Sequence, residues 1–237
     1  MKLRRLKLVQ ALYAFVIVVV VAAICYMANV VILRQTSNPD FMPLFKMSNQ
    51  PEIVLALQIF GLTGLLLPVP ILRKLRIRVP AIIPALWSIF IFSTIFLGEV
   101  CGFYHISHYD KILHIFAGFT IAVLGFLVVD LLDKPKSAGS MSRLFVAVFA
   151  FCFSLALNVS WEIFEFIMDS CFVDSNMQRY MVAPGYPFIG RDALMDTMMD
   201  INVAAIGAIL AVVAISIYAK RHRDWLERSQ LKRIQDK

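Results

Sequence analysis

The sequence predicts an all-α integral membrane protein, a bundle of six transmembrane helices. Of its 237 residues, 60% are hydrophobic and only 16% are charged, proportions far outside those of soluble domains. The mean hydropathy of +0.76 agrees with this class. The chain also contains six apolar runs of 18 or more residues, each long enough to cross a bilayer as a helix. The breaks between the runs are short, so we expect no separate soluble domain.

The six expected spans follow one another over residues 8–33, 53–72, 80–100, 111–132, 144–169 and 192–219. Together they make residues 1–219 one membrane domain, and a basic tail follows at 220–237. The first span comes after a basic N-terminus, as the apolar core of a signal peptide would. Its apolar run is longer than such a core and no clear cleavage site follows it. We therefore expect this span to remain as a membrane anchor.

Positive charge fixes the expected orientation of the bundle. Of the 23 lysines and arginines, 18 lie at the N-terminus, in the loops after the second and fourth spans, and in the tail. Because loops rich in lysine and arginine stay in the cytoplasm, both termini are predicted to be cytoplasmic. The anionic headgroups of membrane lipids account for the net charge of +7, so no nucleic-acid partner is expected.

Acidic residues gather at the opposite, outer side of the predicted bundle. Half of the 16 acidic residues fall at or just inside the outer ends of apolar runs: Glu99, Asp110, Glu162, Glu165, Asp169, Asp192, Asp196 and Asp200. A carboxylate near the centre of a bilayer costs roughly 2.5–3.5 kcal/mol. Several carboxylates at membrane depth therefore indicate a functional site or a buried polar network.

Helical spacing brings these acids onto shared helix faces. Asp110 and His114 are four residues apart in the fourth span, and Asp196 and Asp200 are four apart in the sixth. In the fifth span, a polar stripe runs through Ser154, Asn158, Glu162, Glu165 and Asp169. With a rise of about 1.5 Å per residue, the three spans offer ligand-type side chains at two matching depths.

Small residues continue two of these faces toward the interior. They are Gly118, Ala122 and Gly125 in the fourth span, and Ala204, Gly207 and Ala211 in the sixth. Small residues let membrane helices approach closely. The fourth, fifth and sixth spans are therefore predicted to be close neighbours.

The predicted site has more carboxylates than nearby cations can neutralise. Either several carboxylates are protonated, or a divalent cation supplies the missing charge. The candidate ligands are His114, Glu162, Glu165, Asp196 and Asp200, with Asp110 as a weaker one. This mixture of oxygen and nitrogen ligands suits Mg²⁺, Mn²⁺ or Zn²⁺.

The same residues suggest roles in catalysis. Glu162 or Glu165 is a candidate general base for a metal-bound water. Lys111 and Arg191 are weaker candidates for binding an anionic substrate, although they could equally neutralise the acids beside them.

Three motifs in the last three spans resemble a known family. They are Tyr109-Asp110-Lys111-x-x-His114-x-x-x-Gly118, Trp161-Glu162-x-x-Glu165, and Asp196-x-x-x-Asp200-x₆-Gly207-Ala208. The pattern resembles the multi-pass bacterial inner-membrane proteins typified by YjdF, a family of unknown function, and its Asp-Lys-x-x-His stretch resembles VanZ-like membrane proteins. The resemblance implies a bacterial cytoplasmic membrane location and no activity. Trp161 and Asp192 depart from this pattern.

Three functions remain open on the sequence alone. The first is a metal-dependent hydrolase or transferase that acts on a lipid-linked or envelope substrate, although no known hydrolase signature is present. The second is a cation or proton-coupled transporter, although few polar groups continue the path inward beyond Ser154 and Asn158. The third is a structural or accessory membrane protein whose buried network fixes helix packing. Metal content would separate the first from the others.

Overall fold

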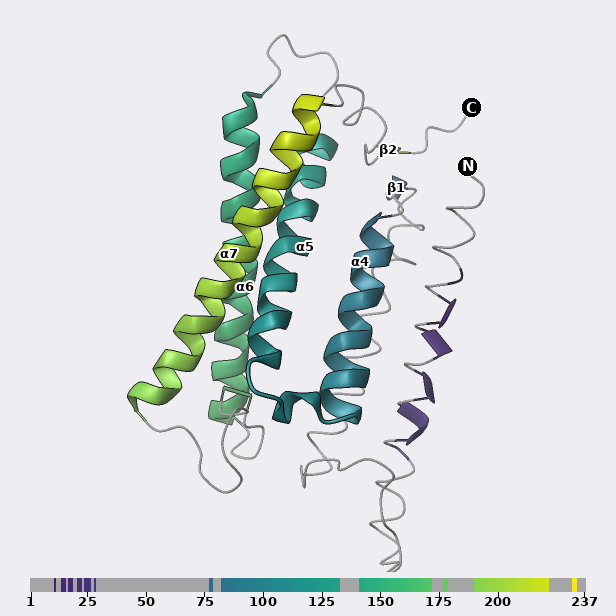
Figure 1. The fold of residues 1–237 in the computed structure, drawn as a ribbon, viewed down its shortest axis with the longest axis vertical. Coiled ribbons are helices and arrows are strands. Elements are labelled where there is room, and N and C mark those ends of the chain that lie inside the picture. Colours follow the sequence, from purple (N-terminus) through teal and green to yellow (C-terminus); the bar gives the residue numbers. More distant parts are fainter. Residues whose placement is uncertain are drawn as a thin grey trace, which may run out of the picture.

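The computed structural model describes residues 77–78, 82–132, 141–171, 177–178, 190–221 and 232–233, with separate positions between 11 and 28. The predicted span at 53–72 lies outside the described residues. Within the predicted span at 8–33, the described positions, among them Phe15 and Tyr26, are helical. The described part of the chain is almost entirely α-helical (Figure 1).

The helices agree with the last four predicted spans to within two residues at each end. They are α4 (Ile82–Ile91), which continues as the π-helix η1 (Phe92–Val100), then the short 3₁₀ helix η2 (Phe103–His105), α5 (Tyr109–Leu132), α6 (Arg143–Cys171) and α7 (Arg191–Arg221). In the described part, three helices are long and apolar enough to cross a membrane, at Tyr109–Val129, Arg143–Cys171 and Arg191–Tyr218. The protein is therefore an all-α membrane protein with several spans, and the count of six stays a prediction.

In the described part of the chain, two very short strands accompany the helices. Strand β1 (Ile77–Arg78) pairs antiparallel with β2 (Lys232–Arg233) in the basic tail. This pair joins the segment before α4 to the segment after α7.

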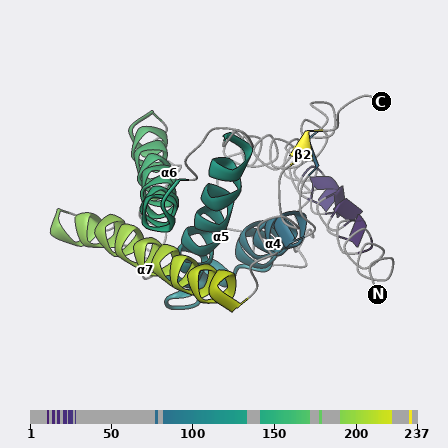
Figure 2. The same cartoon turned by 90° about the horizontal axis from the view of Figure 1, so that it is seen from above.

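Helix α5 is the central element of the described bundle. It lies between α4 on one side and the pair α6 and α7 on the other (Figure 2). Accordingly, 61% of its apolar segment is buried, against 17% for α6 and 22% for α7. The outer faces of α6 and α7 carry exposed apolar side chains such as Leu157, Phe166 and Ile209, as a lipid-facing surface requires.

Glycines set the distance between α5 and α7. A Cβ atom on Gly118 would collide with the backbone carbonyl of Ala204, and one on Gly207 would collide with that of Ile115. A Cβ on Gly125 would press against Ala150 of α6. The prediction that the small residues bring these three helices together is confirmed. Beyond the crossing, toward the C-terminal ends of α5 and α7, the core continues through Ala122, Phe126, Ala150, Ala208, Ala211 and Ile215.

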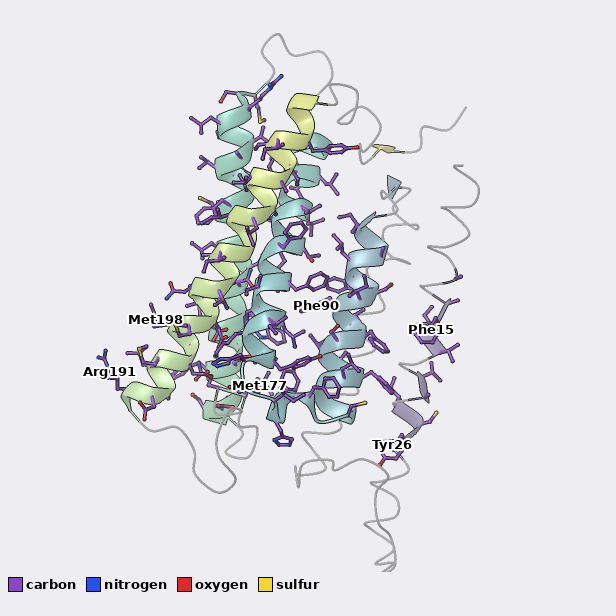
Figure 3. All side chains as sticks on the ribbon, viewed as in Figure 1. Phe15, Tyr26, Phe90, Met177, Arg191 and Met198 are labelled. Carbon is purple, nitrogen blue, oxygen red and sulfur yellow. The ribbon has the colours of Figure 1, made fainter. Side chains whose placement is uncertain are left out.

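The start of α5 is anchored to α4 and its π-helical extension. The hydroxyl of Tyr109 donates a hydrogen bond to the backbone carbonyl of Ser93, at 2.7 Å. Phe90 of α4 points toward α5 (Figure 3) and lies 6.1 Å from the ring of Phe116, measured between centroids. The hydrogen bond to Ser93 ties the π-helix to Tyr109, which is the residue immediately before Asp110.

Candidate metal centre

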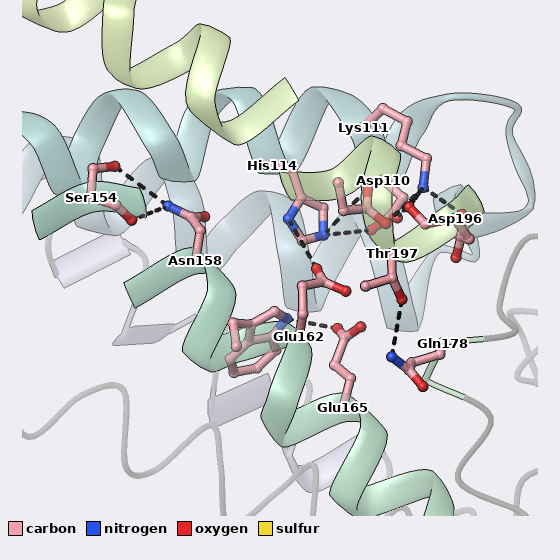
Figure 4. Close-up of polar contacts among 12 residues, drawn as sticks. Asp110, Lys111, His114, Ser154, Asn158, Glu162, Glu165, Gln178, Asp196 and Thr197 are labelled. Atoms are coloured by element: carbon pink, nitrogen blue, oxygen red, sulfur yellow. Dashed lines mark hydrogen bonds and ion pairs between the residues drawn. The ribbon is translucent and has the colours of Figure 1, made fainter. Parts of the chain in front are cut away.

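Six polar side chains meet where α5 begins, α6 ends and α7 begins (Figure 4). We call them the polar cluster: Asp110, Lys111 and His114 from α5, Glu162 from α6, and Asp196 and Asp200 from α7. Three of its members are buried, with exposed fractions of 8% for His114, 4% for Glu162 and 3% for Asp200. The polar side chains that the sequence places on three separate helices therefore lie together in the fold.

The ammonium group of Lys111 holds one side of the polar cluster together. Its Nζ donates to Asp196 Oδ1 at 2.5 Å and to Asp200 Oδ2 at 2.7 Å, and lies 3.5 Å from Asp110 Oδ2. The side chain is only 15% exposed. Ion pairs this sheltered from water are stronger than exposed ones, but the charges must first be desolvated.

The imidazole of His114 lies on the other side of the polar cluster. Its Nε2 is 3.6 Å from Asp110 Oδ1 and 3.7 Å from Asp200 Oδ1, and its Nδ1 is 3.8 Å from Glu162 Oε1. These separations exceed hydrogen-bond length. Two ligands of one ion with bonds of about 2.0–2.2 Å lie roughly 3–4 Å apart. One ligand atom each from Asp110, His114 and Asp200 lies within 4.8 Å of the other two, so this trio has the spacing of a metal site.

Two oxygens of the polar cluster are buried without a hydrogen-bond partner among the described residues. They are Glu162 Oε1 and Asp200 Oδ1, and both face the ring of His114. Buried polar atoms in folded proteins are nearly always satisfied, because leaving one unpaired costs free energy. A cation beside the imidazole would satisfy Asp200 Oδ1 directly.

Glu165 is turned toward a different partner. Its Oε1 accepts a 2.6 Å hydrogen bond from the indole nitrogen of Trp161, which is half exposed on the outer face of α6. It is not part of the trio whose ligand atoms lie together. Glu162 lies at the edge of that trio, beside Nδ1 of His114.

Asp169 and Gln178 tie the end of α6 to α7. The carboxylate of Asp169 accepts the backbone N–H groups of Met177 and Gln178, at 2.7 and 3.0 Å. The side-chain amide of Gln178 donates to Thr197 Oγ1 at 3.0 Å, and Thr197 lies beside Glu162. This chain of contacts reaches from the segment after α6 to the buried carboxylate.

Ser154 and Asn158 serve packing rather than the polar cluster. The Ser154 hydroxyl donates to the backbone carbonyl of Gly118 at 2.8 Å, and the Asn158 amide donates to the carbonyl of Ser154 at 2.8 Å. The Ser154 bond fastens α6 to α5 next to the glycine crossing, whereas the Asn158 bond stays within α6.

Arg191 and Asp192 lie apart from the polar cluster. Both are exposed at the first turn of α7, and Arg191 points away from the bundle (Figure 3). The structure thus brings together five of the six predicted ligands and Lys111, and leaves Glu165, Arg191 and Asp192 outside the polar cluster.

A family model described as "Predicted membrane protein (DUF2238)" matches residues 8–221. The chain belongs to the DUF2238 family. No curated protein and no solved structure matches it. Family membership supports a membrane protein with several spans. It does not test the resemblance to the proteins typified by YjdF or to VanZ-like proteins.

Two residues of this DUF2238 chain belong to the site although sequence reasoning missed them. Thr197 and Gln178 are neutral and polar, and such residues are common at helix ends and in loops. Thr197 stands directly after Asp196, but its link to Gln178 depends on how the segment after α6 folds back. Sequence spacing carries no signal for such a contact.

Proposed function

We propose that this chain is an inner-membrane protein whose polar cluster binds a divalent cation near the outer face and uses it in hydrolysis or group transfer on a lipid-linked or envelope substrate. The observation that carries the proposal is the spacing of Asp110, His114 and Asp200, whose ligand atoms lie within 4.8 Å of one another. The unpartnered oxygen of Asp200 supports it, because that oxygen faces the same point.

Charge balance favours a cation at this position. The polar cluster contains the four carboxylates of Asp110, Glu162, Asp196 and Asp200 and the single ammonium of Lys111. With all of these groups ionised and His114 neutral, the cluster carries a formal charge of −3. A divalent ion reduces this excess to −1 and replaces lost hydration with direct ligands. Oxygen-rich ligation with one imidazole suits Mg²⁺, Mn²⁺ or Zn²⁺.

In this proposal the residues of the cluster take different roles. Asp110, His114 and Asp200 hold the ion through Oδ1, Nε2 and Oδ1. Glu162 stands at the opposite ring nitrogen, the position from which carboxylates usually orient a ligating histidine. A bound divalent ion acidifies a coordinated water and polarises a phosphoryl or carbonyl oxygen.

The surroundings of the cluster favour a substrate with an apolar part. Exposed apolar side chains surround this end of the bundle: Trp161, Phe164, Met195, Met198 and Met199. Methionine and aromatic side chains make an adaptable apolar surface. A lipid-linked substrate could lie along them while its polar group reaches the cluster from the membrane interface.

The ion pairs of Lys111 favour a second candidate function. With Lys111 already bonded to Asp196 and Asp200, protonation of Asp110 and Glu162 would lower the formal charge of the cluster from −3 to −1 without metal. Such a network would serve a proton-coupled transporter or a structural membrane protein. The two candidates differ in whether the purified protein responds to metal.

Thermal unfolding of protein purified in mild detergent tests the proposal. A ligand present at 100 times its dissociation constant stabilises the folded state by about 2.7 kcal/mol. We therefore expect chelation to lower the melting temperature and Mn²⁺ or Zn²⁺ to restore it, and His114→Gln to remove this response. An unfolding curve that neither chelator nor metal shifts would contradict the metal site and favour the metal-free network.

A further inference from the structure

Asp110 and Asp200 each divide their two oxygens between the same two neighbours. Asp110 places Oδ1 3.6 Å from Nε2 of His114 and Oδ2 3.5 Å from Nζ of Lys111. Asp200 places Oδ1 3.7 Å from the same Nε2 and Oδ2 2.7 Å from the same Nζ. Both carboxylates therefore bridge two positions, one beside the imidazole and one at the ammonium.

This double bridge is the arrangement found in sites that hold two metal ions. Such sites place the ions roughly 3.5–4 Å apart and share acidic ligands between them. Each position also needs a ligand of its own. At the first position that ligand is His114, and at the second it is Asp196, whose Oδ1 lies 2.5 Å from Nζ of Lys111.

We propose that Lys111 occupies the place of the second ion in a two-cation carboxylate site, so that one cation is a bound metal and the other is part of the chain. This inference rests on the proposed function, because it takes the first position to hold a divalent ion. The four carboxylates of the cluster would balance two divalent ions, and the ammonium removes the need for the second.

The N–H donors of the Lys111 ammonium group are all directed at carboxylates of the polar cluster, which limits the role of this residue. A lysine ammonium has three N–H donors and no acceptor. Its three carboxylate neighbours, Asp110, Asp196 and Asp200, account for all three donors. Lys111 is therefore a positioning residue that holds the bridging carboxylates toward His114, and the sequence-based expectation that it binds substrate is not supported by its contacts.

The number of metal ions bound by the Lys111→Met variant tests this inference. Methionine keeps an unbranched side chain of similar length and removes the charge. Full-length protein in mild detergent is loaded with Mn²⁺, separated from free ion and analysed for metal and protein. We expect about one ion per chain in the wild type and about two in Lys111→Met, as in a two-metal site.

Two further variants locate the second ion. Adding Asp196→Asn to Lys111→Met removes the ligand that only the second position uses, and should return the count to about one. Arg191→Met removes a cation from the same end of the bundle but outside the cluster, and should leave the wild-type count unchanged. A second ion that persists without Asp196, or that also appears in Arg191→Met, would overturn the assignment.

The outcomes separate this inference from the proposed function. A wild type that binds no Mn²⁺ overturns both. If the wild type and a folded Lys111→Met each bind one ion, the inference is overturned and the proposed function stands. The same holds if the wild type already binds two ions.

If Lys111→Met does not fold, Asp196→Asn alone decides. Its single ion should be retained, because Asp196 serves only the Lys111 side, and loss of that ion would overturn the inference.

Discussion

The two nitrogens of His114 divide the polar cluster into parts with different roles. Nε2 faces Asp110 and Asp200, while Nδ1 faces Glu162. A histidine that binds metal through one nitrogen normally gives the other to a carboxylate, which fixes the ring and raises its basicity. On this arrangement, Glu162 would support a bound ion through the imidazole.

Glu162→Gln tests this division at the scale of single residues. Glutamine keeps the shape of the side chain but removes its charge, so we expect Mn²⁺ affinity to fall by about 10–100-fold, as for other partners of ligating histidines. Titration of the purified variant with Mn²⁺ measures the change.

Glu165→Gln is the matched control, because Glu165 is three residues further along α6 and bonds to Trp161. Its Mn²⁺ affinity should equal that of the wild type. A larger loss in Glu165→Gln than in Glu162→Gln would contradict the arrangement.

The sequence predicts which of these residues share a helix face where helical spacing alone decides. Asp110 and His114, four apart, do share a face, as do Asp196 and Asp200. A step of three residues turns a helix about 60° short of a full turn, and this takes Glu165 off the face of Glu162 and onto that of Trp161. The position of Lys111 could not be predicted, because a long flexible side chain follows its partners rather than the helix periodicity.

The glycine crossing between α5 and α7 determines whether the polar cluster can assemble. At Gly118 and Gly207 the two backbones lie so close together that a Cβ atom on either glycine would collide with the facing helix. Because Asp110 and His114 come from α5 and Asp200 from α7, the width of this crossing sets the distance between the candidate ligands.

Gly118→Val should therefore weaken both folding and metal binding. Inserting side-chain atoms into a packed contact costs about 1–3 kcal/mol, and here they would meet backbone, which cannot rotate away. We expect a lower melting temperature in detergent and a lower Mn²⁺ affinity.

Ile206→Val is the control on the outer face of α7, where the side chain is half exposed. It should change neither quantity. Wild-type stability and affinity in Gly118→Val would show that the helices do not cross at this glycine.

Among the secondary-structure elements, the lengths of the apolar runs predict where the described helices begin and end, but not where a helix is irregular. The ends of α5, α6 and α7 fall within two residues of the predicted ends, because a bilayer sets the length of an apolar helix. The π-helical turns of η1 have no signature in hydropathy. They accompany a contact between Tyr109 and the carbonyl of Ser93, two residues that the sequence separates by a loop.

The pairing of β1 with β2 bears on the topology of the whole molecule. Strands on opposite sides of a bilayer cannot pair, so Ile77–Arg78 and Lys232–Arg233 lie on the same side. An even number of crossings must then separate them. Because α5, α6 and α7 supply three, we infer that α4 and η1 together supply the fourth.

Reporter fusions test the orientation of the whole chain. The distribution of lysine and arginine predicts that fusions at Lys136 and at the C-terminus report from the cytoplasm and that a fusion at Gln35 reports from outside. An outward-facing C-terminus would reverse the orientation and place the polar cluster on the cytoplasmic side. The proposed access to envelope substrates would then fail, whereas the metal site itself would not.

The most direct test of the central claim is pulsed electron paramagnetic resonance of the protein loaded with Mn²⁺ in detergent. The chain contains four histidines, and of those that the structure describes only His114 lies in the polar cluster. We predict a bound Mn²⁺ coupled to one imidazole nitrogen, and loss of that nitrogen coupling in His114→Gln. Absence of bound Mn²⁺, or a nitrogen coupling that survives in His114→Gln, would contradict a metal centre built on Asp110, His114 and Asp200.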